Sequence, residues 1–375
     1  MKKILMNAMT IKEGGGAVVF TRTFNEMLRQ TPDIHWIVVI DNVLNEKIQV
    51  SDQVTILTFP WVKKSPLHLL YWNEIVLPKI IRNKQVDCVY SQINTLPFRK
   101  LPCPAFLSIL QAGYFSKEFI ALNAKYNNTL KQKIGWGIRK KWVFSSIKKA
   151  DKITVPTQAL ANEIIAQLKI DKNKVSVILP GIGLAEGRVD PKFYPKQKTW
   201  RIGYITKFGV QKNFEVLFHA AAQLKSKQID FKIILTLNEN TNTFKQVNKL
   251  IEKYNIAALI ENHGELADKA IRELYITLDL FVFPSLCESI GFTLLEAMHY
   301  RLPIIAASIL SNHELLGEKG LFFQPHDADQ LTEKIVFLME SEKQYLAMSD
   351  YSIERSDLFS WKKSAMETLE ILNTF

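Results

Sequence analysis

The stretch Asp279–Met298, DLFVFPSLCESIGFTLLEAM, has the pattern of a strand, a turn and a helix. The apolar run at its start predicts a strand of a parallel sheet. We expect the helix to begin near Gly291 or Phe292. Backbone N–H groups at a helix start are unpaired and lie at the positive end of the helix dipole, which suits a phosphate. The stretch therefore predicts an α/β fold with an anion site beyond a strand.

Two glutamates, Glu288 and Glu296, flank this turn eight residues apart. On one continuous helix they would be separated by about 12 Å. That exceeds the roughly 5–9.5 Å of a glycoside hydrolase pair, so a hydrolase is disfavoured. If the stretch instead folds as a strand, a turn and a helix, Glu288 lies on the loop side of a phosphate bound at the helix start, and Glu296 lies inside the helix. The two carboxylates could then bind hydroxyl groups on the two sides of that phosphate. Glutamate near a helix start is also favoured without a ligand, so the pair alone leaves a structural role open.

Strands alternate with helical segments in both halves of the chain, which predicts two Rossmann-like domains with parallel sheets. We expect the ligand site in a cleft between them, and a Pro- and Gly-rich linker over Leu179–Lys196. The predicted strands lie near Ile4–Met6, Trp36–Ile40, Thr55–Thr58, Cys88–Tyr90, Ala105–Leu110, Ile153–Val155, Val177–Leu179, Ile202–Ile205, Ile233–Leu237, Leu280–Phe283, Ile304–Ala307 and Leu321–Phe323.

Composition and charge limit the class of protein. Three cysteines without a CxxC pair argue against a disulfide framework or a structural zinc site. The apolar run at the start of the sequence ends at Asn7, which is too short for a signal peptide. We therefore expect a cytoplasmic protein. Residues 1–185 hold 26 Lys and Arg against 12 Asp and Glu, a net charge of +14, whereas residues 186–375 carry −3. Such asymmetry predicts two domains with different partners.

The segment NHGELADKAIRELYITLDLFVFPSLCESIGFTLLEAMHYRLPIIAASI, with GEKGLFFQPHDADQL after it, resembles the retaining glycosyltransferases of family 4. Glu288 and Glu296 match the E-x7-E motif of that family. DKITVPTQALANEI resembles the end of its first domain and FSWKKSAMETLEI its last helix. The resemblance is strongest over roughly residues 200–330. It implies the GT-B fold, with an acceptor-binding domain at 1–185 to which a helix at 356–375 crosses back, and a nucleotide-sugar domain at 186–355.

The resemblance also implies a role for each matching position. Glu296 would bind the ribose, and Glu288 would contact the donor sugar and stabilise positive charge at its anomeric carbon. Lys207 and Lys212 stand where the family has an Arg and a Lys that bind the diphosphate. The diphosphate would also contact backbone N–H groups of Gly291, Phe292, Thr293 and Leu294. The nucleobase would lie against Asn262, Gly264 and Leu266.

Two further positions concern the N-terminal half. Gly14–Gly16 follows the first strand, and we expect a helix from near Ala17, with Gly15 and Gly16 close to the donor. Contiguous glycines disfavour an NAD fingerprint. Gln111 occupies the place of a histidine found in many family members. An amide cannot transfer a proton at neutral pH, which argues against a side-chain base at this position. A front-face reaction, in which the departing phosphate takes the acceptor's proton, is compatible with the change.

The resulting hypothesis is a cytoplasmic, retaining, metal-independent glycosyltransferase without a cofactor, whose donor is a nucleoside diphosphate sugar. Its acceptor would be a glycan or a lipid-linked glycan of a bacterial surface polysaccharide. The alternatives are a GT-B sugar-nucleotide epimerase, a glycogen-type synthase and a non-catalytic sugar-nucleotide-binding subunit. Asp327–Asp329 has the D-x-D pattern of a metal–diphosphate motif, but its position before a helical segment predicts a helix N-cap instead.

A basic segment predicts a membrane partner. Lys131–Lys152 contains eight Lys and Arg but one acid, with Trp136, Trp142 and Phe144 interleaved. Cations beside aromatic residues suit the surface of an anionic bilayer, so we expect peripheral binding at the inner face of the plasma membrane. Nucleic acid is disfavoured because no recognised nucleic-acid module surrounds the segment.

Overall fold

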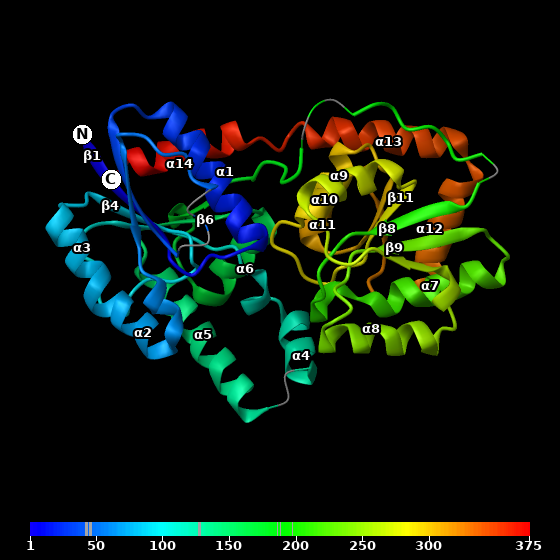
Figure 1. The fold of residues 1–375 in the computed structure, drawn as a ribbon, viewed down its shortest axis with the longest axis horizontal. Coiled ribbons are helices and arrows are strands. Elements are labelled where there is room, and N and C mark those ends of the chain that lie inside the picture. The colour runs from blue at the N-terminus through cyan, green and yellow to red at the C-terminus, as the bar shows by residue number, and fades with distance from the viewer. Residues whose placement is uncertain (42–43, 45–46, 127–128, 186, 188, 197) are drawn as a thin grey trace. The chain divides into compact units, whose positions relative to one another are not determined.

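The computed structural model describes the whole chain except residues 42–43, 45–46, 127–128, 186, 188 and 197. It divides into two compact units (Figure 1). The first unit comprises Met1–Ser116, Asn127–Gly181 and Phe359–Phe375, and the second comprises Lys117–Tyr126 and Ile182–Leu358. The predicted boundary at residues 185 and 186 falls partly outside the described residues.

The described part of the first unit contains a seven-stranded parallel sheet in the order β3-β2-β1-β4-β5-β6-β7. Its strands are β1 (Lys2–Ala8), β2 (Ile34–Ile40), β3 (Val54–Thr58), β4 (Cys88–Ser91), β5 (Ala105–Ser108), β6 (Lys152–Val155) and β7 (Val175–Val177). Its helices are α1 (Gly14–Gln30), α2 (Pro66–Tyr71), α3 (Leu77–Lys84), α5 (Leu130–Lys149), α6 (Gln158–Leu168) and α14 (Trp361–Asn373). Short helical turns are η2 (Pro60–Lys64), η3 (Trp72–Val76), η4 (Ala112–Tyr114) and η5 (Lys172–Lys174).

The second unit contains, within its described residues, a six-stranded parallel sheet in the order β10-β9-β8-β11-β12-β13. Its strands are β8 (Trp200–Tyr204), β9 (Phe231–Leu235), β10 (Ile260–Asn262), β11 (Leu280–Phe283), β12 (Ile304–Ala307) and β13 (Leu321–Phe323). Its helices are α4 (Lys117–Tyr126), α7 (Phe214–Ser226), α8 (Asn242–Lys253), α9 (Asp268–Thr277), α10 (Phe292–His299), α11 (Leu310–Leu316), α12 (Ala328–Glu340) and α13 (Glu342–Ser356), with turns η6 (Val210–Lys212) and η7 (Ala257–Leu259). The prediction of two parallel α/β domains is confirmed.

Three details of the prediction are wrong. Strand β7 lies two residues earlier than expected, because the turn η5 leads directly into it. Helix α1 begins at Gly14 rather than near Ala17, so the glycines form its first turn instead of a loop before it. Strand β10 was not predicted, since it is a three-residue edge strand with two polar residues.

Helix α4 belongs to the second unit, although residues 117–126 were expected in the N-terminal domain. It packs against η6, and the Glu118 carboxylate lies 2.8 Å from Nε2 of His326. The chain thus leaves the first unit after Ser116 and returns to it at Asn127. Tertiary contacts of this kind have no local signature in the sequence.

Helix α14 packs on α1 within the first unit (Figure 1). Ala365, Leu369 and Leu372 are buried in the same core as Phe20 and Phe24 of α1. The last residues are also bonded to the first strand, because Lys2 Nζ donates to the carbonyls of Leu372 and Phe375 at 2.7 and 3.0 Å. The C-terminal helix is therefore an integral layer of the first unit.

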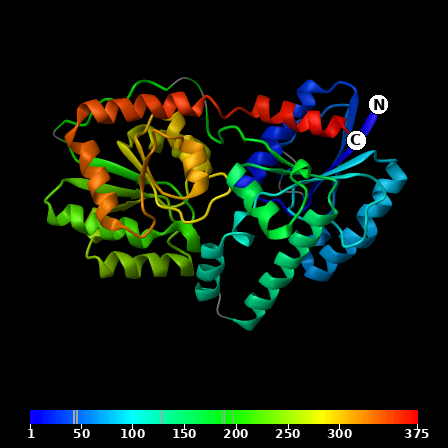
Figure 2. The same cartoon turned by 180° about the vertical axis from the view of Figure 1, so that it is seen from behind.

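The basic helix α5 has a buried and an exposed side. Its start extends away from the sheet of the first unit (Figures 1 and 2), with a capping box made by Thr129 and Gln132. Trp142 donates to the Leu96 carbonyl and stacks on Phe98, and Phe144 stacks on Phe115. The expectation that Trp142 and Phe144 face a membrane is therefore wrong, because both pack within their own unit.

Candidate functional site

The second sheet reverses its strand order between β8 and β11, and ligands of open α/β sheets bind beyond the carboxyl ends of strands at such a point. Lys212 in η6 follows β8, and Glu288 lies in the loop after β11. Their side chains are bonded, with Nζ of Lys212 2.6 Å from Oε1 of Glu288. Only 15% and 13% of these side chains are exposed. The sequence predicted both residues, and the fold brings them into direct contact.

The loops that carry this pair are held by three hydrogen bonds. The buried Tyr204 hydroxyl donates to the Lys212 carbonyl at 2.8 Å. The Leu286 N–H donates to the Gln211 carbonyl at 2.9 Å. Asn213 Nδ2 donates to the Pro284 carbonyl at 3.2 Å. Because both loops are cross-linked in this way, the cation and the carboxylate are positioned before any ligand binds.

Helix α10 begins at Phe292, as predicted, behind Gly291 in a left-handed conformation (φ 67°). A β-carbon there would lie 3.1 Å from the Phe283 ring, so both conformation and space favour glycine. The Leu294 N–H already donates to the Gly291 carbonyl at 2.8 Å, and the Leu294 side chain is fully buried. Leu294 therefore packs in the core and its N–H is bonded within the helix, and Gly291, Phe292 and Thr293 precede it at the start of α10.

Glu296 lies inside the second unit with 6% of the residue exposed. Its Oε2 accepts a hydrogen bond of 2.9 Å from the Tyr275 hydroxyl. Burial raises the pKa of Glu296 to about 7, and the hydrogen bonds from Tyr275 and the Leu184 backbone offset this only in part. The carboxylate is therefore bonded to Tyr275 just over one turn after the start of α10.

The second predicted cation, Lys207, has a different environment from Lys212. Its side chain is 66% exposed, and Nζ lies 3.6 Å from the Glu265 carboxylate. A surface pair at that distance is weak. Of the two lysines, only Lys212 makes a part-buried contact with a predicted catalytic side chain, that of Glu288.

The predicted nucleobase segment follows β10. Asn262 uses its side chain to fix the neighbouring loop, accepting from the Leu237 N–H and donating to the Leu237 carbonyl at 2.8 and 2.9 Å. Gly264 adopts φ 69°, with no atom within 4 Å of a β-carbon position. Leu266 is half-buried. Asn262 is thus a positioning residue, and Gly264 leaves its backbone open to an approaching group.

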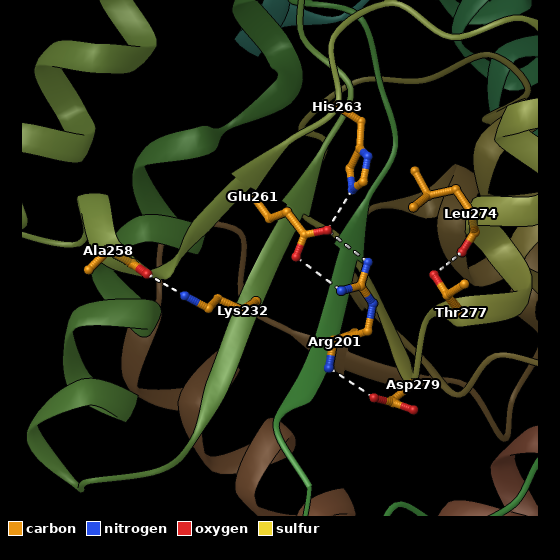
Figure 3. A network of polar contacts seen from close by, with 8 residues as sticks. All are labelled: Arg201, Lys232, Ala258, Glu261, His263, Leu274, Thr277 and Asp279. Atoms are coloured by element: carbon orange, nitrogen blue, oxygen red, sulfur yellow. Dashed lines mark hydrogen bonds and ion pairs between the residues drawn. The ribbon is translucent and has the colours of Figure 1, made fainter.

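A polar network beneath this segment had no recognisable signal in the sequence (Figure 3). Arg201 on β8 reaches across β9 and binds both carboxylate oxygens of Glu261 on β10, each at 3.0 Å. Glu261 also contacts Nε2 of His263 at 2.7 Å, and the Arg201 guanidinium lowers the pKa of Glu261. The bidentate pair anchors the edge strand that leads into the nucleobase segment.

The remaining predicted residues lie in the first unit. Gly15 and Gly16 are in the first turn of α1, and Gln111 precedes η4. Gly16 and Gln111 line one cavity beyond the carboxyl ends of β1, β4 and β5.

Two other features bear on the chemistry. Asp327 caps α12, because its carboxylate accepts from the Gln330 N–H at 2.9 Å, so the N-cap prediction for Asp327–Asp329 is confirmed. In the described part of the chain, no group of three or more His, Cys, Asp or Glu is placed to hold a metal ion. Among the described helices, none combines the length and apolar character needed to cross a bilayer.

Two family models match the chain in succession. Residues 14–186 match the model described as Glycosyltransferase Family 4, and residues 188–355 match Glycosyl transferases group 1. The serotype-specific mannosyltransferase WbdA of Escherichia coli is 25% identical over 239 residues, which are 60% of this chain and 29% of that protein. A D-inositol 3-phosphate glycosyltransferase of Paenarthrobacter aurescens is 22% identical over 233 residues, or 59% of this chain and 57% of that protein. The chain thus aligns with less than a third of WbdA.

Solved structures share the fold. HepE of Anabaena, solved with UDP and glucose, has a TM-score of 0.72 at 16% identity, with 100% of both chains covered. The sucrose-phosphate synthase of Thermosynechococcus elongatus has a TM-score of 0.73 at 15% identity, with 100% of this chain and 99% of that chain covered. Since the two family models together span nearly all of a chain with this fold, the chain belongs to the GT-B glycosyltransferases of the family 4 type.

Proposed function

We propose that the chain is a retaining glycosyltransferase that moves a sugar from a nucleoside diphosphate donor to a glycan or a lipid-linked glycan. The observation that carries this proposal is the part-buried Lys212–Glu288 contact of 2.6 Å at the strand-order reversal of the second sheet. A cation suits the diphosphate there, and a carboxylate suits a sugar that gains positive charge. The similarity to a serotype-specific mannosyltransferase supports a role in surface polysaccharide synthesis.

In the proposed reaction, the bond between the anomeric carbon and the phosphate oxygen breaks, and the acceptor oxygen bonds to the same face of that carbon. The acceptor's proton moves to the departing phosphate oxygen. Lys212 and the N–H groups at the start of α10 stabilise the charge on the diphosphate. Glu288 stabilises the positive charge on the sugar ring. Gln111 can hydrogen-bond a hydroxyl but transfers no proton, and the scheme requires none from it.

The test begins with a thermal-shift panel of nucleoside diphosphate sugars, followed by turnover of whichever donor stabilises the protein most. A donor at 100 times its Kd adds about 2.7 kcal/mol of stability. We expect transfer to an acceptor, or slow donor hydrolysis, in the presence of EDTA. Stabilisation without any turnover would instead indicate a non-catalytic subunit, and free epimerised donor would indicate an epimerase. Loss of activity in EDTA with recovery in magnesium would contradict metal independence.

The two lysines should differ in their effects. Lys212→Ala is expected to weaken binding of the bare nucleoside diphosphate about ten- to hundredfold, because it removes a charge-assisted contact at a part-buried position. Lys207→Ala should have a smaller effect, since its charge is mostly exposed. Calorimetric titration measures both, with Lys253→Ala, an exposed lysine paired with Glu215, as the matched control. Equal losses for Lys207→Ala and Lys212→Ala would contradict the assignment.

We also propose that the first unit binds the inner face of the plasma membrane. Leu130, Ile134 and Ile138 lie four residues apart on α5, and 74%, 53% and 57% of them are exposed. They therefore form one apolar stripe on the helix surface. Exposed cations, among them Lys131 and Lys133, flank the stripe. Each cation near an anionic surface contributes about 1 kcal/mol, so the attraction would be appreciable and reversible.

Co-sedimentation with lipid vesicles measures this attraction. We expect strong binding to anionic vesicles and weak binding to neutral ones. Binding should be lost near 1 M salt, where the Debye length falls to about 3 Å. The double variant Ile134→Ser and Ile138→Ser should bind more weakly, whereas Leu310→Ser, which alters an exposed leucine of the second unit, should not. Equal recovery in the supernatant with both vesicle types at low salt would rule the surface out.

A further inference from the structure

Tyr275 of α9 contacts the first turns of α10 in the second unit. Its side chain is fully buried. Its hydroxyl is bonded to two acceptors, Oε2 of Glu296 at 2.9 Å and the carbonyl oxygen of Thr293 at 3.2 Å. A tyrosine hydroxyl has one proton to donate, and a charged carboxylate is a stronger acceptor than a carbonyl. When Glu296 is charged, Tyr275 therefore donates to its carboxylate.

Aromatic neighbours hold the ring of Tyr275 in place. It stacks on Tyr300, with the ring centroids 5.1 Å apart and an angle of 4° between the ring planes. Its centroid also lies 6.0 Å from that of Phe281 on β11. The Tyr300 hydroxyl in turn donates to the Leu184 carbonyl at 3.2 Å. Because the ring is packed in this way, the direction of the Tyr275 hydroxyl is set before a nucleotide binds.

The Glu296 carboxylate can accept more hydrogen bonds than it receives from the protein. A carboxylate has about four acceptor positions on its two oxygens. The Tyr275 hydroxyl occupies one of them, and the Leu184 backbone bonds to the carboxylate as well. Within the described residues this leaves about two positions. The ribose of a nucleotide presents two adjacent hydroxyl donors, which matches that number.

The same hydrogen bonds favour the charged form of Glu296, which is the form that accepts most strongly from hydroxyl groups. Burial raises the pKa of Glu296, whereas the bonds from Tyr275 and the Leu184 backbone lower it. Tyr275 itself keeps its proton, because burial holds its pKa well above the ordinary value. Tyr275 thus both orients the carboxylate and supports its charge.

We infer that Tyr275 is a positioning residue for the donor nucleotide, and that it acts through Glu296 to set how tightly the ribose hydroxyls are bound. The inference rests on the proposed function, because that function supplies the nucleotide whose ribose Glu296 would bind. It adds a residue from α9 to a site whose other candidate side chains lie in the loops and on α10.

Calorimetric titration of the full chain with UDP, GDP and ADP tests this inference. The nucleotide that binds most tightly is then compared with its 2′,3′-dideoxy analogue. Tyr275→Phe removes the hydroxyl and keeps the ring, so it should weaken binding of the ribonucleotide about three- to tenfold, the effect of one hydrogen bond. The dideoxy analogue should bind equally to Tyr275→Phe and to the unaltered protein, because it has no ribose hydroxyls for Glu296 to accept from.

Two further variants complete the measurement. Tyr275→Phe combined with Glu296→Gln should bind the ribonucleotide no more weakly than Glu296→Gln alone, because Tyr275 acts through Glu296. Tyr345→Phe is the matched control. Tyr345 is also fully buried in the second unit, and its hydroxyl makes no hydrogen bond within the described residues. Its affinity for the ribonucleotide should equal that of the unaltered protein.

The outcomes separate this inference from the proposed function. Equal losses of affinity for the ribonucleotide and the dideoxy analogue in Tyr275→Phe would indicate a general structural effect and would overturn the inference. Additive losses in the double variant would also overturn it. Absence of binding for all three nucleotides would overturn it together with the proposed function. The expected losses in a protein that turns over no nucleotide sugar would support the inference and count against the proposed function alone.

Discussion

Glu288→Gln is expected to lower turnover about 100- to 1,000-fold, the usual effect of removing one preorganised group that stabilises transition-state charge. The carboxylate would act on positive charge that develops at the anomeric carbon only during reaction, so its loss should affect kcat more than donor binding. Glutamine has nearly the same shape and can still accept the Lys212 hydrogen bond, so the fold should be retained. Steady-state turnover of the donor found in the nucleotide-sugar panel measures the effect.

Binding of the bare diphosphate provides the second measurement on Glu288→Gln. Since the neutral amide no longer compensates the Lys212 charge, diphosphate affinity should be unchanged or higher. Glu265→Gln is the matched control, because Glu265 is an exposed carboxylate beside Lys207 and should keep full turnover. Turnover of Glu288→Gln within about threefold of the unaltered enzyme would remove Glu288 from the reaction.

Glu296→Gln is expected to raise the free energy of unfolding by about 3 kcal/mol at pH values well above 7. Burial raises the pKa of Glu296 from its ordinary value of 4.5 to about 7. A difference of one pH unit between the folded and unfolded pKa values corresponds to about 1.36 kcal/mol of stability. Between these two values the unfolded chain has lost the proton while the folded chain keeps it. The unaltered protein should therefore lose stability as pH rises from about 4.5 to about 7 and then remain level.

Urea unfolding of both proteins at about pH 5 and about pH 8.5 measures this difference. The two should be nearly equal in stability at the lower pH, and Glu296→Gln should be the more stable at the higher pH. The same variant should bind nucleoside diphosphate more weakly, since the charged carboxylate is proposed to bind the ribose hydroxyls. A stability difference that does not change with pH would show that Glu296 is not buried as described, and unchanged diphosphate affinity would remove it from the ribose.

The sequence by itself determined the fold class and most of the strands. Strands β11, β12 and β13 lie where they were predicted, because short apolar runs between helical segments are the strongest local signal of a parallel sheet. Gly291 also indicated the start of α10 in the sequence, because glycine readily adopts the left-handed conformation that the structure shows there. Glu288 and Glu296 could also be identified as candidate site residues, because the sequence around them resembles the E-x7-E motif of the family, whereas their spacing alone left a structural role open.

Only the tertiary structure decided which of these residues act together. Lys207 and Lys212 are five positions apart in one loop region, yet Lys207 is exposed and Lys212 is part-buried against Glu288 from a distant loop. Helix α4 joins the second unit through long-range contacts such as Glu118 with His326. The burial of a side chain and its bonding partners depend on residues that are far away in the chain. Strand and helix patterns depend on neighbouring residues, so these patterns can be read directly from the sequence, whereas burial and partners cannot.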